Sequence, residues 1–138
     1  METVAQVSAS AAASLEVQQL LRSVSELTRD NFGLYHAHIY LVDEENQSLV
    51  LAAGAGDVGQ QMASRGHRIP VSKEDSIVAQ SVRQRRGVIA NNVQQDPNFL
   101  PNPMLPDTKS EMAVPMIAGD RVIGVLDVQA DQTNYFDQ

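Results

Sequence analysis

Two pairs of short apolar segments, each joined by a tight polar turn, constrain the fold of this chain more than any other feature. Residues 35–42 are rich in aromatic and β-branched side chains, and residues 48–53 form a similar run after the turn Asp-Glu-Glu-Asn-Gln. Residues 110–117 and 121–129 repeat the arrangement around an Ala-Gly-Asp turn. Such runs are typical of β-strands, and short turns join antiparallel neighbours. The sequence therefore predicts two β-hairpins, with Pro115 at an edge or bulge position.

Two segments have the periodicity and end signals of helices. In residues 14–32, an apolar stripe with helical spacing is formed by Val17, Leu20, Leu21, Val24 and Leu27. Ser14 is suited to the N-cap and Gly33 to the C-terminal stop. Residues 73–86 follow Ser72, which has an acidic residue three positions later, the spacing of a capping box. We expect a helix in each segment.

The remaining segments complete an α+β arrangement. Residues 1–13 are interpreted as an N-terminal tail or linker, or as the end of a helix from an upstream domain, and residues 54–59 as a glycine-rich loop. Residues 68–71 and 88–93 are expected to be short strands. Residues 94–109 contain four of the six prolines, which predicts a long irregular loop of the kind that forms lids or binding loops. One sheet is expected, with the first helix on one face and the second helix and this loop on the other.

Composition excludes several classes of function. The formal net charge of −7 disfavours binding to nucleic acids and to anionic membranes. The absence of cysteine removes disulfides, thiolate catalysis and thiolate metal sites. No apolar run approaches the ~20 residues of a membrane span, and Met1-Glu2-Thr3-Val4 does not resemble a secretory signal. We expect a soluble cytoplasmic domain with no membrane contact.

Five segments in their order along the chain resemble the GAF family of sensory domains, as found in bacterial multi-sensor histidine kinases and related signalling proteins. They are residues 32–43, residues 69–78, residues 87–99, residues 110–116 and residues 119–128. The resemblance covers about residues 15–131. It implies a GAF domain over residues 14–138, with a central antiparallel six-stranded sheet, helices on one face and a pocket-forming helix and loop layer on the other.

The chain departs from the GAF pattern in two respects. GAF domains usually continue after the last strand into a long C-terminal helix, and here the sequence stops where that helix is expected to begin. The resemblance therefore implies that this helix is missing or truncated, or that a second chain covers the face. The absence of cysteine excludes covalent attachment of a bilin, and it excludes the thiol chemistry of GAF-type free-methionine sulfoxide reductases.

The resemblance places the ligand pocket between the sheet and the layer of the second helix and long loop. The residues expected to bind a ligand are Ile69, Ile77, Val78, Val88, Phe99, Leu100, Leu105, Ser110, Glu111, Met112 and Val114. Most are apolar, and the polar pair Ser110 and Glu111 is suited to fix the polar end of a ligand. The alternative for the apolar residues is that they belong to the ordinary core, and for the polar pair that it ties down the loop.

The three histidines raise the question of a metal or haem. His36 and His38 alternate on one strand, so both side chains point to the same face of the sheet. Two imidazoles can share a metal, but no third ligand is visible, so we expect a structural role and no metal site. If haem binds, His67 is the first candidate for its axial ligand. The alternative is that His67 is a loop residue in contact with solvent.

These observations favour a small-molecule-sensing regulatory domain of a signal-transduction protein, such as a histidine kinase of a two-component system. Ligand binding is expected to be coupled to the geometry of a homodimer and passed to an output kinase or regulator domain in the full-length protein. The alternatives are a dimerisation module that binds no ligand, and a sensor of haem or a non-covalent chromophore. No set of nucleophile, base and orienting residue is visible, so we expect no enzyme activity in this chain. No cofactor is assigned.

Overall fold

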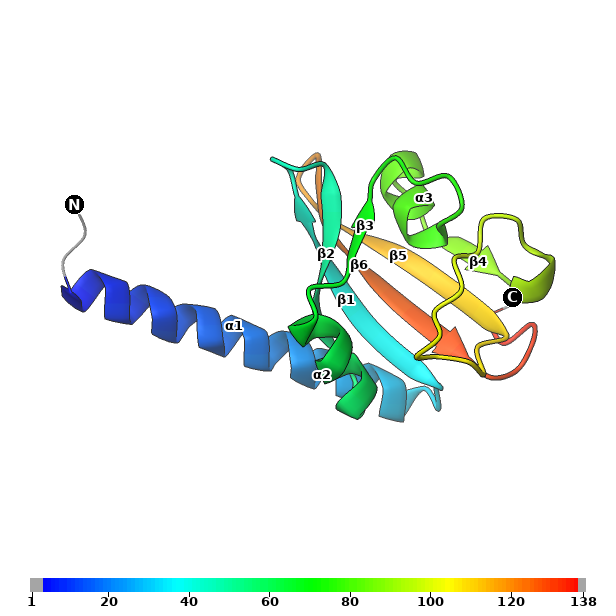
Figure 1. Ribbon diagram of the computed structural model, residues 1–138, viewed down its shortest axis with the longest axis horizontal. Coiled ribbons are helices and arrows are strands. Elements are labelled where there is room, and N and C mark those ends of the chain that lie inside the picture. The colour runs from blue at the N-terminus through cyan, green and yellow to red at the C-terminus, as the bar shows by residue number, and fades with distance from the viewer. Residues whose placement is uncertain (1–3, 137–138) are drawn as a thin grey trace.

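The computed structural model describes residues 4–136, and the side chains of residues 15–136. At its centre is a six-stranded sheet in which every pair of neighbouring strands is antiparallel. The strands are β1 (His36–Asp43), β2 (Ser48–Gly54), β3 (Arg68–Pro70), β4 (Val88–Ala90), β5 (Ser110–Ala118) and β6 (Arg121–Ala130). Their order across the sheet is β3-β2-β1-β6-β5-β4 (Figure 1). The predicted α+β fold with a six-stranded antiparallel sheet is confirmed.

Helices cover both faces of this sheet. Helix α1 (Val4–Asn31) lies behind β1 and β2 and extends beyond the sheet, whereas α2 (Gly56–Ser64) and α3 (Ile77–Gln84) lie on the front face (Figure 1). A single 3-10 turn, η1 (Val93–Gln95), begins the long loop that crosses the front face before β5. Among the described residues, no helix has the length and apolar character needed to cross a membrane.

Helix α1 differs from the prediction in its start and in the face that packs on the sheet. It begins at Val4, ten residues before the predicted N-cap. Ser25 is fully buried against the sheet, and Gln18 donates to the carbonyl of Ala52 at 3.0 Å. The predicted apolar stripe largely faces away, with Leu20 and Leu27 61% and 59% exposed. The helix therefore packs on the sheet through small and polar side chains and leaves most of its apolar row uncovered.

The prediction of a loop over residues 54–59 was wrong beyond its first residues, because helix α2 begins at Gly56. A Cβ on Gly59 would lie only 2.1 Å from the carbonyl carbon of Gly54. Only a residue without a side chain allows the helix to approach the end of β2 this closely. The glycines that suggested a loop are thus partly a contact surface between a helix and a strand.

Helix α3 begins later than predicted. Ser76, not Ser72, is the N-cap: its backbone is extended and its Oγ accepts a hydrogen bond from the amide of Ala79 at 3.1 Å. The helix ends at Gln84, and its C-cap residue Arg85 has a left-handed φ of 56°. Pro115 lies beyond the short ladder that joins β4 to β5, so on that side of β5 no strand pairs with it.

Candidate functional site

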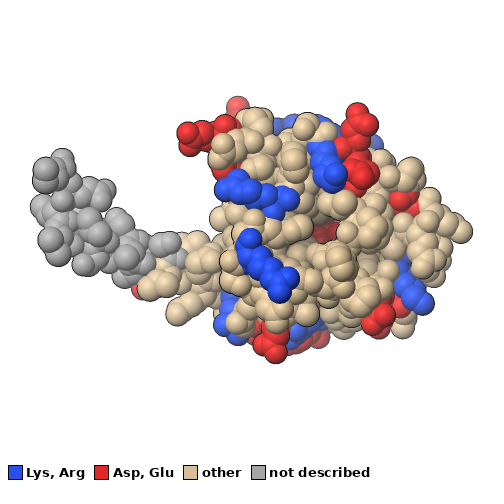
Figure 2. All heavy atoms as spheres, in the orientation of Figure 1, with Lys and Arg blue, Asp and Glu red and all other residues tan. Residues whose placement is uncertain are grey.

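A cavity of about 350 Å³ opens between the front face of the sheet and the layer formed by α2, α3 and the long loop. Its volume is within the range of about 300–1,000 Å³ that is usual for small-molecule pockets. Strand β1 contributes His38 and Tyr40 to the floor, and β5 and β6 contribute Glu111 and Gln129. Figure 2 shows acidic atoms at the bottom of a hollow on this face, with basic side chains around it.

A chain of hydrogen bonds begins at residues that line the floor of the cavity and continues to buried residues behind it. Asp127 is fully buried, and its Oδ2 lies 2.7 Å from Nε2 of His38 and 2.8 Å from Nε2 of Gln129. Because a carboxylate can only accept, both nitrogens donate to it. His38 Nδ1 in turn lies 3.1 Å from Nε2 of His36, within hydrogen-bond distance. Gln129 Nε2 is also 3.1 Å from Oε2 of Glu111.

Three adjoining strands bring this network together. In the β1–β6 ladder, His38 lies opposite Asp127 and His36 lies opposite Gln129. In the β5–β6 ladder, Glu111 lies opposite Gln129. Directly opposed side chains on one face are the closest neighbours in an antiparallel sheet. We call these five residues, His36, His38, Glu111, Asp127 and Gln129, the polar floor. Each is at most 5% exposed.

The pKa values of the two carboxyl groups of the polar floor are shifted in opposite directions. Burial, and then the charge and hydrogen bonding of Asp127, raise the pKa of Glu111 well above its usual range. Burial opposes the ionisation of Asp127 as well, but hydrogen bonds from Glu111, His38 and Gln129 outweigh it and lower the pKa of Asp127. Glu111 is thus the carboxyl that holds a proton, and Asp127 is the carboxylate.

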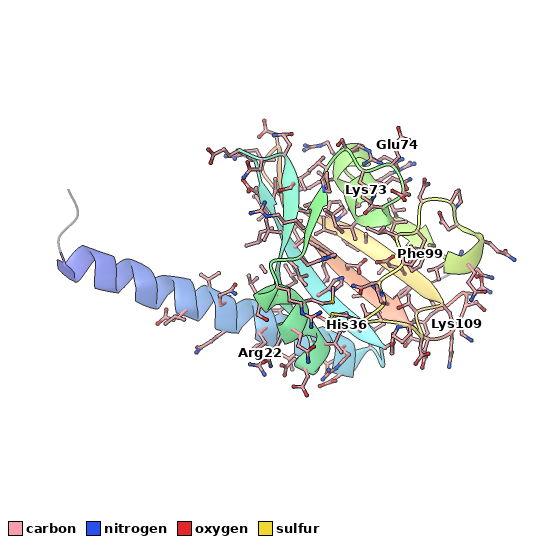
Figure 3. All side chains as sticks on the ribbon, in the orientation of Figure 1. Arg22, His36, Lys73, Glu74, Phe99 and Lys109 are labelled. Carbon is pink, nitrogen blue, oxygen red and sulfur yellow. The ribbon has the colours of Figure 1, made fainter. Side chains whose placement is uncertain are left out.

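The histidine at the end of the chain is neutral. Burial, and then the neighbouring His38, lower the pKa of His36 from 6.5 to about 3. Figure 3 labels His36, which lies at the start of β1 opposite Gln129 of β6. A neutral His36 has one ring nitrogen that donates and one that accepts, so it can hydrogen-bond to His38 in either tautomer.

The walls of the cavity join α2 to the long loop through two methionines. Asn102 Nδ2 in the loop lies 3.5 Å from the sulfur of Met62 in α2, and Arg65 lies 3.7 Å from the sulfur of Met104. His67 is half-buried on the wall, with its ring centroid 6.1 Å from that of Tyr40. Among the described residues, no group of three or more His, Cys, Asp or Glu side chains is arranged to hold a metal ion.

The structure brings about half of the predicted binding residues to the cavity. Ile69, Ile77, Val78, Leu100 and Glu111 line it, and so does His67. Whether these residues contact a ligand, and whether His67 could ligate haem, remain predictions. Phe99 and Leu105 instead line a separate hollow on another side of the same loop, which Figure 3 locates by its label on Phe99. Val88 is half-buried in β4 and packs against the core.

The other three predicted residues lie on the opposite face of the sheet. Side chains alternate along β5, so Ser110, Met112 and Val114 point away from the face that carries Glu111. Ser110 Oγ donates to the carbonyl of Gln132 at 2.7 Å. Met112 lines a second cavity of about 360 Å³ at the C-terminal end of α1. The expectation that all three face the pocket was wrong, because it ignored the two-residue period of a strand.

The main functional candidates that sequence reasoning missed are the polar partners of Glu111. Asp127 and Gln129 were not assigned to the pocket, and His38 was assigned a structural role. A signal was present in the sequence: β1 and β6 each carry polar residues two positions apart within otherwise apolar strands. Such a pattern places the polar side chains on one face, where two adjoining strands can pair them.

Comparisons with known proteins agree on the fold of this chain. The GAF domain family matches residues 14–138. GAF domain-containing protein A of Dictyostelium discoideum is 29% identical over 118 residues, which are 86% of this chain and 68% of that protein. The free methionine-R-sulfoxide reductase of Neisseria meningitidis, solved in complex with its substrate, is 26% identical with a TM-score of 0.73. The match covers 87% of this chain but only 66% of the reductase, less than two thirds of its length.

A third match is to a GAF domain from a signalling-type protein. The GAF domain of an Acinetobacter phosphoenolpyruvate-protein phosphotransferase is 23% identical with a TM-score of 0.70, over 84% of this chain and 66% of that one. At this identity the likeness is one of fold alone. An antiparallel sheet with a cavity under a helix and loop layer places the chain in a class of small α+β domains. Within this class, the chain belongs to the GAF domain family.

The same comparisons correct one prediction. We expected no enzyme activity in this chain, because no catalytic set was visible in the sequence. That expectation was wrong. The structures that this chain resembles include free methionine-R-sulfoxide reductases, which are enzymes. The domain could itself be catalytic.

Proposed function

We propose that this chain is a regulatory GAF domain that binds a small polar molecule in the cavity above the polar floor. The observation that carries the proposal is the combination of an apolar wall and a buried polar end in one cavity of about 350 Å³. Pockets for small molecules are mostly apolar and use a few fixed polar groups to orient the ligand. Glu111 is such a group: it is 95% buried, yet it lines the cavity.

The best lead for the ligand is a free amino acid of the size of methionine sulfoxide. The Neisseria reductase, which resembles this chain over most of its length, is named for free methionine-R-sulfoxide and was solved with its substrate. A ligand of that size suits a cavity at the lower end of the usual range. Ile77, Val78 and Leu100 supply apolar wall for a side chain, and the polar floor supplies partners for its charged or polar groups.

Reduction of a sulfoxide is a second candidate function, and the same likeness favours it. Conversion of a sulfoxide to a thioether and water consumes two electrons and two protons. Two thiols that become a disulfide would supply both. The chain has no cysteine, so both thiols would come from a separate dithiol reductant. This makes the reaction testable with a small dithiol in the assay.

We further propose that binding is passed on through a homodimer to an output domain. The exposed row of α1, formed by Val17, Leu20, Val24 and Leu27, is between 38% and 61% exposed. An apolar row of this kind on a helix is typical of a helix–helix interface. Helix α1 also contacts β2 and β1, and β1 carries His36 and His38 of the polar floor. A ligand that fits one arrangement of α2 and the loop better than another shifts the population of the two.

Native mass spectrometry of the purified chain, followed by isothermal titration calorimetry with L-methionine sulfoxide, tests these proposals. We expect a non-covalent mass or measurable binding that is lost in Leu100→Trp, which fills the cavity from its half-buried loop. Ile123→Trp is the matched control, because Ile123 is 47% exposed and does not line this cavity. Binding that survives Leu100→Trp would contradict the site.

Two further readouts separate the alternatives. Formation of methionine from its sulfoxide in the presence of dithiothreitol supports the reductase candidate, and its absence at high protein concentration counts against it. An absorbance scan checks for a haem or another chromophore. A chain that is dimeric, carries no ligand and binds none of the amino acids tested would instead be a dimerisation module.

A further inference from the structure

The polar floor contains two carboxyl groups but no permanently charged cation. Glu111 and Asp127 are 5% and 0% exposed. Their hydrogen-bond partners, His38 and Gln129, are an imidazole and a neutral amide. Two carboxylates that are buried together repel each other and lack the hydration that would stabilise them. This site therefore needs a positive charge, from a proton or from a ligand.

Both carboxyls also have acceptor capacity that the protein leaves open. Asp127 Oδ1 is buried and has no hydrogen-bond partner among residues 4–136. Within the same residues, Gln129 is the one side chain that donates to Glu111, and it reaches Oε2 and not Oε1. Glu111 lines the cavity, so a group that enters can reach its carboxyl. A buried acceptor without a donor is rare and costly, and it indicates a missing hydrogen.

The charged and titratable groups around Glu111 come from every element packed against it. They are Asp127 on β6, His36, His38 and Tyr40 on β1, Asp96 in the long loop, and Arg65 and His67 between α2 and β3. Arg65 is the fixed positive charge of this set, but it is exposed and its guanidinium contacts Met104 at the mouth. The positive charge of Arg65 therefore lies at the exposed entrance of the cavity, and the negative charge of the carboxyl groups lies at its buried end.

We propose that the ammonium group of the ligand binds at Glu111, in the cavity, and takes the place of a proton that Glu111 shares with the buried Asp127 in the free protein. The inference rests on the proposed ligand-binding function and adds the chemical class of the ligand, an amine that is protonated in solution. In the free protein, Glu111 is protonated and supplies the hydrogen that Asp127 Oδ1 needs. In the complex, the ammonium at Glu111 supplies the positive charge beside the two carboxyls, and the proton of Glu111 leaves to solvent.

Two measurable consequences distinguish the replacement of a proton by an ammonium group from binding through apolar contacts alone. One proton is released for each ligand bound while Glu111 is protonated in the free protein. The dissociation constant therefore falls about tenfold for each unit of pH increase in that range. An amine-bearing ligand also binds at least about tenfold more tightly than the same molecule without its amine, the size expected for hydrogen bonds to a charged group.

Calorimetry with matched probes tests the inference. L-Methionine sulfoxide is compared with 4-(methylsulfinyl)butanoic acid, and L-norleucine with hexanoic acid, so that each pair differs only in the amine. Each titration is run in two buffers of different ionisation enthalpy, which gives the number of protons released. We expect tighter binding of the amine in at least one pair, with release of about one proton.

The variant Glu111→Gln keeps the shape of the side chain but cannot release a proton. It should lose both the proton release and the preference for the amine, while Glu45→Gln, at an exposed position in the β1–β2 turn, should keep both. Infrared difference spectra give a readout that does not depend on the variant. The carbonyl band of a protonated carboxylic acid should be present in the free wild-type protein and disappear when the amine binds.

The outcomes separate failure of this inference from failure of the proposed function. Equal binding of the amine and its deaminated partner overturns the inference and leaves the pocket intact, and so does amine binding without proton release. If no probe of either pair binds, the proposal of an amino-acid-sized ligand fails, and this inference fails with it.

Discussion

Acidification should destabilise the protein through His36, and the size of the effect follows from its surroundings. His36 is 3% exposed, and burial followed by the neighbouring His38 lowers its pKa from 6.5 to about 3. In the unfolded chain the imidazole takes up a proton as the pH falls below about 6.5. In the folded protein it does so only near pH 3. Between these values the unfolded state binds more protons, so stability falls as the pH falls.

The magnitude is about 1.4 kcal/mol for each pH unit within this window, because one proton separates the two states. Between pH 6.5 and pH 4.5, this single group should remove about 2–3 kcal/mol from the free energy of unfolding. The total stability of a small domain is about 5–15 kcal/mol, so a loss of this size is measurable. Carboxyl groups titrate over the same range, and a variant is needed to isolate the histidine.

The variant His36→Gln provides that comparison. Glutamine does not titrate, and its amide can donate to His38 Nδ1 or accept from it, as the imidazole can. Urea unfolding followed by circular dichroism at several pH values from 4.5 to 7 should show the wild type losing about 2–3 kcal/mol more than the variant. Parallel curves for the two proteins would refute the reasoning, and so would an NMR titration in which the ring of His36 protonates near pH 6.5.

Three further predictions concern the scaffold. Gly59→Ala should lower the free energy of unfolding by about 2 kcal/mol, because overpacking against the backbone outweighs the gain of about 1 kcal/mol in helix propensity. The control Gly87→Ala should not lower it, because a Cβ there meets nothing nearer than 3.8 Å. Thermal unfolding compares the two variants, and an unchanged stability of the Gly59 variant would contradict the close contact. Ser76→Ala should cost about 1 kcal/mol in urea unfolding, since it removes the cap of α3, and no change would mean that the cap contributes nothing. Replacement of both Leu20 and Leu27 by Lys should give a monomer by analytical ultracentrifugation if α1 forms the dimer interface, and an unchanged mass would place the interface elsewhere.

The hairpins were predictable because their signals are local. Alternating side chains and a short turn fix an antiparallel pair within about twenty residues, and the structure contains both hairpins close to the predicted bounds. Helix α2 was not predictable in this way, since Gly56 and Gly59 look like loop residues until β2 is placed beside them. The start of α3 was ambiguous as well, because Ser72 and Ser76 both suit an N-cap and only the fold selects the second.

The packing face of α1 shows a different limit of sequence reasoning. An apolar stripe predicts which side of a helix avoids water, but not which surface covers that side. Here the sheet is covered by the side with Ser25, while Leu20 and Leu27 remain exposed. The apolar stripe is present in the helix, and the error was to assume that it packs on the sheet of this domain.

The candidate site was half predictable for a similar reason. Glu111 was identified as polar and close to the pocket, but its partners are distant in sequence: Asp127 is 16 residues away and His38 is 73 residues away. Only the strand order β1-β6-β5 brings them together. Met112 and Val114 were assigned to the cavity because they neighbour Glu111 in sequence, although alternation along β5 separates them from it.

The cost of the polar floor is itself an argument that it binds something. Replacement of buried ionic groups by well-packed apolar residues is often neutral or stabilising, so a sheet selected for stability alone has little need of them. Here five polar side chains occupy one face of three adjoining strands, at the centre of the domain, and one carboxyl of the set is forced to hold a proton. Departures from local rules of this kind are concentrated at functional sites. In this chain the buried polar groups lie at the bottom of a ligand-sized cavity, where the ammonium group of a ligand can supply the positive charge that the protein does not provide.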